Sequence, residues 1–201
     1  MPHALRRVDI GEEALADLEV IVGFDDDLAG EVTRISNRVR GLLTQVHPAL
    51  ERVLGPIVQR PVTLDLLTRF GGPDGLRAAG RRRLLAVTKP RAPRSYERLV
   101  EQIQAALTEQ TVTVPGTRAA ELVLPQLAKT LTGLLAQRAA AAAQIETILD
   151  AHPLSPVLTS MPGVGVRTAA RILIEVGDGS AFPTSGHLAA YAGVAPVTHR
   201  S

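Results

Sequence analysis

The stretch that decides the fold reads VLTSMPGVGVRTAARILIEVG and spans residues 157–177. Its Pro162–Gly165 run predicts a turn, because glycine tolerates a positive φ and lets the backbone approach a neighbour closely. After the turn, apolar side chains recur at helical spacing, and Gly177 stands where the helix would end. The stretch therefore predicts a short apolar segment, a glycine hairpin and a helix.

This pattern is typical of a helix-hairpin-helix, in which N–H groups at the start of the second helix point toward a DNA phosphate. Two arginines four residues apart would share one face beside that phosphate. The alternative is that the glycines only allow two helices to pack closely, and the residues alone favour neither reading. The candidate DNA-binding residues are Gly163, Val164, Gly165, Arg167, Thr168 and Arg171.

Two apolar seams upstream of the hairpin predict long helices. The first steps by three and four residues from Leu28 to Val53 and is interrupted at Pro48. The second runs from Leu124 to Leu149, within a helix expected over 117–150. Such seams bury against each other in an antiparallel hairpin or against a second copy of the chain, and both arrangements stay open.

Shorter elements fill the middle of the chain. Helices are expected over 62–70 and 96–108, with a turn at 71–74 and Pro73 opening the next helix. Aromatic residues make up only 2% of the chain, so the core must be aliphatic, and aromatic stacking platforms for single strands are not expected. The fold class is therefore mainly α, with long coiled-coil-like helices followed by a small helical domain that contains the helix-hairpin-helix-like element.

Positive charge gathers in the middle of the chain, although the formal net charge is only +2. Residues 56–100 carry ten basic side chains and three acidic ones. Backbone-phosphate contacts are one interpretation of this basic cluster, and a solvated, partly mobile loop around two prolines is the other. The possible nucleic-acid contacts are Arg81, Arg82, Arg83, Lys89, Arg91 and Arg94.

Several kinds of site are excluded or disfavoured. The chain has no cysteine, and it has no apolar run of membrane-spanning length or of signal-peptide type, so a soluble cytoplasmic protein is expected. The acidic run Asp25–Asp27 does not predict a metal site, because consecutive helical side chains diverge; beside Gly23 it indicates a helix break or a solvated turn. His187 is expected to be a helix-start or packing residue rather than a base. No metal ligand set is predicted.

The C-terminal quarter resembles a known family. The matching residues are the run Met161–Gly165, then Thr168–Ala170, Glu175–Asp178, Phe182, His187–Gly193 and the pair Ala195–Pro196. Together they resemble the C-terminal transposase domain of the IS110 (IS116) family of bacterial insertion sequences. The segment from His187 to Pro196 is the most specific part, and a weaker likeness extends through the rest of the chain.

The resemblance implies an N-terminal RuvC-like domain with four metal-binding acids, a helical coiled-coil region and this C-terminal domain, which supplies a serine nucleophile. It also implies a structured guide RNA. By position, Ser201 matches the nucleophile, and it is the last residue printed. None of the four acids maps onto this sequence, so we expect a chain truncated at both ends and inactive by itself. No cofactor is expected in this chain, and a divalent metal is expected only in the missing domain.

We therefore expect residues 1–152 to be the helical, coiled-coil region and residues 153–201 to be the first part of the transposase domain. The expected function is DNA binding in transposition and site-specific recombination of an insertion sequence. The expected partners are DNA, a guide RNA, and a second copy or a full-length transposase held through the helical seams, with no membrane. The alternatives are a non-catalytic helical partner that modulates a full-length transposase and a stand-alone helix-hairpin-helix DNA-binding protein.

Overall fold

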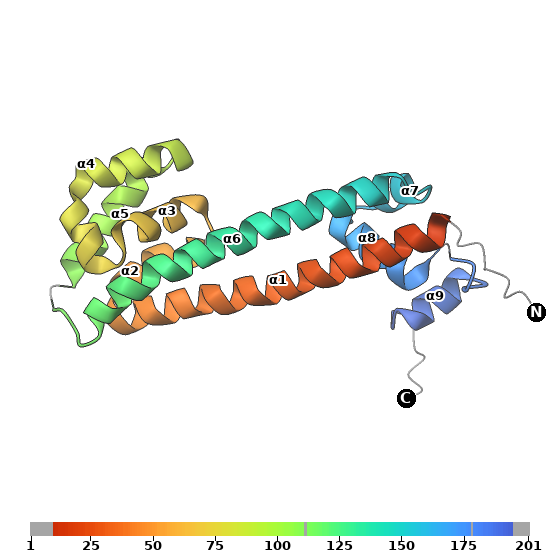
Figure 1. Ribbon diagram of the computed structural model, residues 1–201, viewed down its shortest axis with the longest axis horizontal. Coiled ribbons are helices and arrows are strands. Elements are labelled where there is room, and N and C mark those ends of the chain that lie inside the picture. Colours follow the sequence, from red (N-terminus) through yellow and green to blue (C-terminus); the bar gives the residue numbers. More distant parts are fainter. Residues whose placement is uncertain (1–9, 111, 178, 195–201) are drawn as a thin grey trace, which may run out of the picture. The chain divides into compact units, whose positions relative to one another are not determined.

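The computed structural model describes residues 10–110, 112–177 and 179–194. These residues form nine α-helices and one 3-10 turn, without a strand in the described part (Figure 1), so the mainly α prediction is confirmed. The helices are α1 (Ile10–Val46), α2 (Pro48–Leu54), α3 (Pro61–Phe70), α4 (Pro73–Arg91), α5 (Tyr96–Glu109), α6 (Thr117–Asp150), α7 (Ser155–Thr159), α8 (Val166–Val176) and α9 (Ser185–Tyr191), and the 3-10 turn is Gly55–Ile57.

The chain divides into two compact units. Unit 1 comprises the described residues of Met1–Asp26 and Ala140–Ser201, and unit 2 is Asp27–Ala139. Each unit thus takes one end of α1 and one end of α6. The boundary expected at residue 152 stays a prediction. Within the described residues, no helix is long and apolar enough to cross a membrane.

Unit 2 has an aliphatic core to which both long helices contribute. Val39 and Leu43 of α1 are completely buried, as are Leu124 and Leu131 of α6, and all four belong to one apolar cluster. Unit 1 repeats this arrangement, because Leu18 of α1 shares a cluster with two apolar residues near the end of α6. In unit 2, therefore, the two predicted seams bury against each other within one chain, whereas in unit 1 the end of the second seam packs on residues of α1 that precede the first seam.

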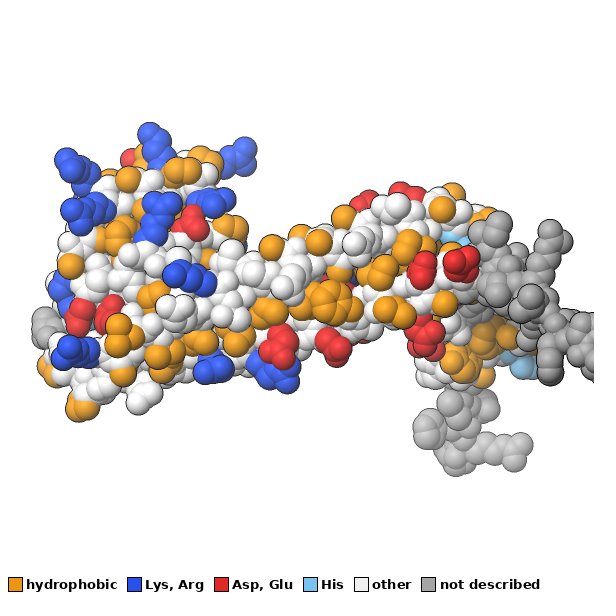
Figure 2. All heavy atoms as spheres, in the orientation of Figure 1, with side chains coloured by type: hydrophobic (Ala, Val, Ile, Leu, Met, Phe, Trp, Pro, Cys, Tyr) orange, Lys and Arg blue, Asp and Glu red, His pale blue; other side chains and the backbone are white. Residues whose placement is uncertain are grey.

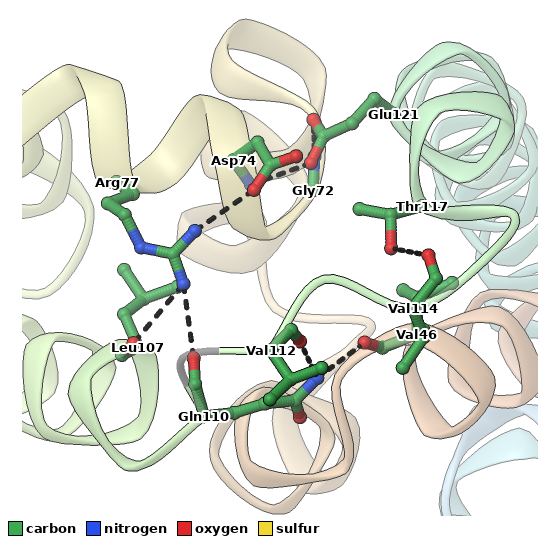
Figure 3. Close-up of polar contacts among 10 residues, drawn as sticks. All are labelled: Val46, Gly72, Asp74, Arg77, Leu107, Gln110, Val112, Val114, Thr117 and Glu121. Atoms are coloured by element: carbon green, nitrogen blue, oxygen red, sulfur yellow. Dashed lines mark hydrogen bonds and ion pairs between the residues drawn. The ribbon is translucent and has the colours of Figure 1, made fainter.

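A tight corner joins α3 to α4 in unit 2. Gly71 ends α3 with a φ of +79°, and its N–H donates to the Leu67 carbonyl at 2.9 Å. The Glu121 carboxylate of α6 then accepts the Gly72 N–H at 2.6 Å and the Asp74 N–H at 2.7 Å (Figure 3). These contacts satisfy donors that the start of α4 leaves open, and the carboxylate lies where the helix dipole favours negative charge. The predicted turn at 71–74 and the opening of α4 at Pro73 are confirmed.

Arg77 fastens α4 to the end of α5. Its guanidinium donates to Asp74 at 2.9 Å, to the Leu107 carbonyl at 3.2 Å and to the Gln110 carbonyl at 3.3 Å (Figure 3). The Gln110 side chain in turn donates to the Val46 carbonyl at the end of α1, at 2.9 Å. Arg77 and the Gln110 side chain thus connect the first part of α4 with the ends of α5 and α1.

The buried side chain of His47 is expected to make the stability of unit 2 depend on pH. It is 2% exposed, its Nδ1 accepts the Leu50 N–H at 3.1 Å to cap α2, and its Nε2 has no partner among the described residues. Burial lowers the pKa of His47 below 6.5, with the Arg77 charge adding to the effect. Because the unfolded chain binds this proton more readily, the free energy of unfolding should fall as the pH drops through and below 6.5.

Chemical denaturation across a pH series measures this dependence, and His47→Asn provides the control, because Asn caps a helix without titrating. We expect the wild type to lose more stability than His47→Asn between neutral and mildly acidic pH. Parallel pH profiles for the two proteins would contradict the prediction.

Candidate nucleic-acid interface

The hairpin predicted from residues 157–177 is present in unit 1. Helix α7 contacts α8, and between them the Val164 N–H donates to the Met161 carbonyl at 3.1 Å. Gly163 has a φ of +82°, which glycine adopts without strain. Gly177 follows α8 with a φ of +62° and closes the helix with a bond of 2.8 Å to the Leu173 carbonyl. The predicted turn and the end of the helix at Gly177 are therefore confirmed.

The two hairpin glycines face open space. A Cβ atom built on either Gly163 or Gly165 would have no neighbour within 4 Å among the described residues. Close packing of helices does not explain them, because such a contact would place atoms of the other helix near that Cβ. Gly165 is also the N-cap of α8, and no side chain accepts a hydrogen bond there. The start of α8 is thus accessible from outside.

The opposite face of α8 anchors the hairpin. Its small and apolar side chains enter the core of unit 1, where they meet α1, α6 and α7. The buried members of this cluster are Leu18, Val22, Ile145, Leu149, Leu158, Ala169, Ala170 and Leu173. The inner face of α8 is therefore buried in the core of unit 1 and attaches the hairpin to that core.

Both hairpin arginines are paired with α1. Arg167 donates from Nε to Asp25 Oδ2 at 2.7 Å and from Nη2 to Oδ1 at 3.3 Å, while Arg171 pairs with Asp26. The Asp25 side chain is only 4% exposed, whereas that of Arg167 is 43% exposed. Much of the positive charge expected beside the hairpin is therefore compensated within unit 1.

The expectation of a helix break or solvated turn at Asp25–Asp27 was wrong. All three residues lie inside α1, and Asp25 occupies its buried face. The physical reason is that Arg167, 142 residues away, supplies the charge that lets this carboxylate be buried. The absence of a metal site at this run stays a prediction; among the described residues no group of three His, Cys, Asp or Glu side chains could hold a metal ion.

Helix α9 carries most of the described part of the segment His187–Pro196, whose last two residues, Ala195 and Pro196, lie outside the described residues. The N-cap Thr184 contacts His187 Nδ1 through its hydroxyl at 2.8 Å, which confirms His187 as a helix-start residue. The ring of Tyr191 lies 5.3 Å from that of Phe182, and its hydroxyl donates to Glu175 of α8 at 3.4 Å. The expected nucleophile Ser201 lies outside the described residues, and its role stays a prediction.

The structure corrects the loop reading of the basic cluster. All of its residues except Arg94 lie in α4, which bends at Gly80 (φ +68°) and continues through Pro90 to Arg91. Arg81 pairs with Glu101 at 3.5 Å, and Lys89 lies 5.9 Å from the centre of the Tyr96 ring. Figure 2 shows basic side chains gathered over this part of unit 2.

Arg91 pairs with Asp65 at 2.8 Å, whereas Arg82, Arg83 and Arg94 have no ion pair with any described residue. Arg91 and Arg94 line a cavity of about 590 Å³ together with Arg60 and Arg98, which the sequence reasoning did not single out. Both residues belong to the basic stretch 56–100, and Arg98 follows Arg94 by four residues, but only the tertiary structure brings Arg60 beside them.

The sequence of this chain, including the hairpin, is similar to those of known proteins. Residues 155–201 match the family described as "Transposase IS116/IS110/IS902 family". The whole chain is 58% identical to "Insertion element IS110 uncharacterized 43.6 kDa protein" of Streptomyces coelicolor, and 31% identical to "Insertion element IS900 uncharacterized 42 kDa protein" of Mycobacterium paratuberculosis, covering 50% of each.

A 45-residue segment is 47% identical to the "Pilin gene-inverting protein" of Moraxella bovis, over 22% of this chain and 14% of that protein. No solved structure matches. The chain spans about half the length of the insertion-element relatives named above.

Proposed function

We propose, on the premise that this chain belongs to the IS116/IS110/IS902 transposase family, that it acts in DNA transposition and recombination and binds DNA through its glycine hairpin. The contact would be made by backbone N–H groups at the start of α8, between Gly165 and Thr168, to a phosphate of the DNA backbone. The proposal concerns this DNA contact and leaves the chemistry of strand transfer to the whole protein.

The observation that carries the proposal is the open start of α8. The first N–H groups of a helix have no partner within the helix, and the N-cap Gly165 offers no side chain to satisfy them. The empty space around Gly163 and Gly165 lets a phosphate oxygen reach these donors. The positive end of the helix dipole adds a favourable field at the same place.

The ion pairs of Arg167 and Arg171 limit what these two side chains contribute to DNA binding. Since Arg167 and Arg171 are already paired with Asp25 and Asp26, we assign the phosphate contact to the backbone and a smaller share to the two guanidiniums. Such contacts carry no base information by themselves. We therefore expect duplex binding that is weak in sequence preference and falls steeply with salt.

Gly165→Asp tests the proposal while preserving the fold. Asp is a favourable N-cap residue, the Gly165 φ of −93° suits it, and its side chain would enter open space. Its carboxylate would, however, occupy the phosphate position and repel the DNA. We expect an unchanged or slightly higher melting temperature and an affinity for duplex DNA lower by about tenfold or more, measured by fluorescence anisotropy across a salt series.

Gly133→Asp is the matched control, because it adds the same charge at an open position of α6 in the other unit. An equal loss of affinity in both variants would show that only net charge matters and would overturn the hairpin assignment. A structured RNA hairpin is titrated alongside the duplex, because the resemblance implies an RNA ligand. Sensitivity of RNA binding to Gly165→Asp would extend the same contact to RNA.

A further inference from the structure

The cavity in unit 2 takes no part in the DNA contact proposed for the hairpin. It has a volume of about 590 Å³, within the range of small-molecule sites, and it lies where the end of α4 and the start of α5 meet the 3-10 turn and the start of α3. All of its lining residues lie between positions 53 and 102, so the site belongs entirely to unit 2.

The charged residues that line the cavity are all positive. Four arginines, Arg60, Arg91, Arg94 and Arg98, are among the residues that line the cavity, and no Asp or Glu of the described part of the chain is. Arg91 is paired with Asp65, which lies outside the lining, whereas the other three have no ion pair among the described residues. Gathering like charges without a counter-charge is unfavourable, and an anion that accepts several guanidinium hydrogen bonds would relieve the repulsion.

The start of α5 points to the same ligand chemistry. Ser95, the N-cap of this 14-residue helix, lines the cavity, and no side chain caps the helix there. Its first-turn N–H groups and the positive end of its dipole lie beside the arginines, because Arg98 and Leu99 of α5 also line the cavity. Guanidinium forks next to an open helix start suit a phosphate group.

The remaining wall is aliphatic. Val62 and Leu99 are buried beneath the cavity, and the half-buried Val53 and Ile57 extend this apolar surface. An inorganic anion would leave this part unused, whereas a phosphate that carries a planar apolar group would cover it. Arginine planes stack on nucleobases, so the scarcity of aromatic residues does not prevent base binding here.

We propose that this cavity binds a nucleotide, with its phosphate on Arg60, Arg94, Arg98 and the start of α5, and its base against the aliphatic wall. The nucleotide is either free or an unpaired residue of a nucleic-acid strand, since both offer the same chemistry. The site is separate from the hairpin of unit 1, so it goes beyond the proposed DNA contact and does not depend on it.

Calorimetric titration of the full chain with AMP, inorganic phosphate and adenosine tests the proposal. We expect AMP to bind about tenfold more tightly than phosphate, because only AMP uses the aliphatic wall, and adenosine to bind more weakly than AMP by a similar factor. Bound AMP should also protect backbone amides at the start of α5 from hydrogen exchange. Equal affinities for AMP and phosphate, or no AMP binding at all, would overturn the proposal.

A pair of double variants separates the cavity from general positive charge. Arg94→Gln with Arg98→Gln should lower the AMP affinity by about tenfold or more, because hydrogen bonds to charged groups are lost. Arg82→Gln with Arg83→Gln removes the same charge from exposed positions of α4 outside the lining, and it should leave the affinity within about twofold. Equal losses in the two double variants would contradict the assignment.

Competition identifies the source of the nucleotide. Displacement of AMP by a short single strand at much lower concentration supports an unpaired strand residue, and tighter binding of AMP than of the strand supports a free nucleotide. Displacement by a blunt duplex or an acidic peptide as effective as that by AMP would overturn the proposal. Gly165→Asp should leave AMP binding unchanged, so failure at the hairpin and failure at this cavity give different results.

Discussion

Gly75→Ala is expected to lower the free energy of unfolding of unit 2 by about 3 kcal/mol or more, because it forces a methyl group into backbone. A Cβ atom at this position would lie 1.6 Å from the Phe70 carbonyl oxygen and 2.8 Å from the Phe70 carbonyl carbon. Such distances are far inside van der Waals contact, so the end of α3 or the start of α4 would have to move.

Hydrogen bonds hold both the end of α3 and the start of α4 in place. The end of α3 is held by the bond from the Gly71 N–H to the Leu67 carbonyl, and the start of α4 is held by the Glu121 carboxylate on Gly72 and Asp74. A shift large enough to admit the methyl group would break at least one of these contacts. The loss of stability therefore combines overpacking with lost hydrogen bonds.

Urea denaturation followed by circular dichroism measures the change, and amide hydrogen exchange in α4 locates it. Gly41→Ala is the matched control, because Gly41 lies exposed inside α1 of the same unit and its added Cβ would meet no atom within 4 Å. That substitution should stabilise the chain by about 0.5–1 kcal/mol through helix propensity. If Gly75→Ala behaved like Gly41→Ala, the tight corner would be disproved.

The elements that the sequence predicted well are those set by neighbours in the chain. The long helix over 117–150, the opening of α4 at Pro73 and the glycine hairpin all follow from local spacing, proline and glycine, and the structure confirms each. The end of α1 at Val46, two residues before Pro48, follows from the same kind of signal.

The features that the sequence did not reveal depend on distant partners. Burial of Asp25 requires Arg167, and the capping of α4 requires Glu121, about 49 residues from Gly72. Helix α4 also continues through Pro90, because a proline in the last turn removes one donor there while the Ala92 N–H still bonds to the Thr88 carbonyl at 2.8 Å. Local periodicity carries no information about such pairings.

In the two candidate sites, too, some features follow from local sequence and others depend on distant partners. The hairpin was found because its glycines form a continuous pattern, whereas the ion pairs that compensate its arginines were not foreseen. The basic cluster was found from composition, but its cavity needs Arg60 and Arg98 from other elements. Sequence patterns therefore predicted both candidate regions, whereas the charge pairing within each depends on the tertiary structure.

Arg167→Met is expected to destabilise unit 1 by about 2–3 kcal/mol, because it leaves the Asp25 carboxylate buried without its main counter-charge. Asp25→Leu should cost less, about 1 kcal/mol, because the half-exposed Arg167 side chain keeps access to water. The double variant removes both charges and places apolar groups in contact with α1 and α8. Its stability should return to within about 1 kcal/mol of the wild type.

Denaturation of the four proteins forms a double-mutant cycle whose coupling energy measures the pair. Additive losses in the cycle would show that Asp25 and Arg167 do not stabilise each other.

The DNA affinities of the same four proteins also show whether the Arg167 side chain contacts DNA. If the backbone of α8 makes the phosphate contact, the stable double variant should bind duplex DNA within about twofold of the wild type, because the charge it loses was already compensated. A loss of about tenfold would instead assign Arg167 a direct phosphate contact and reverse the division between backbone and side chain.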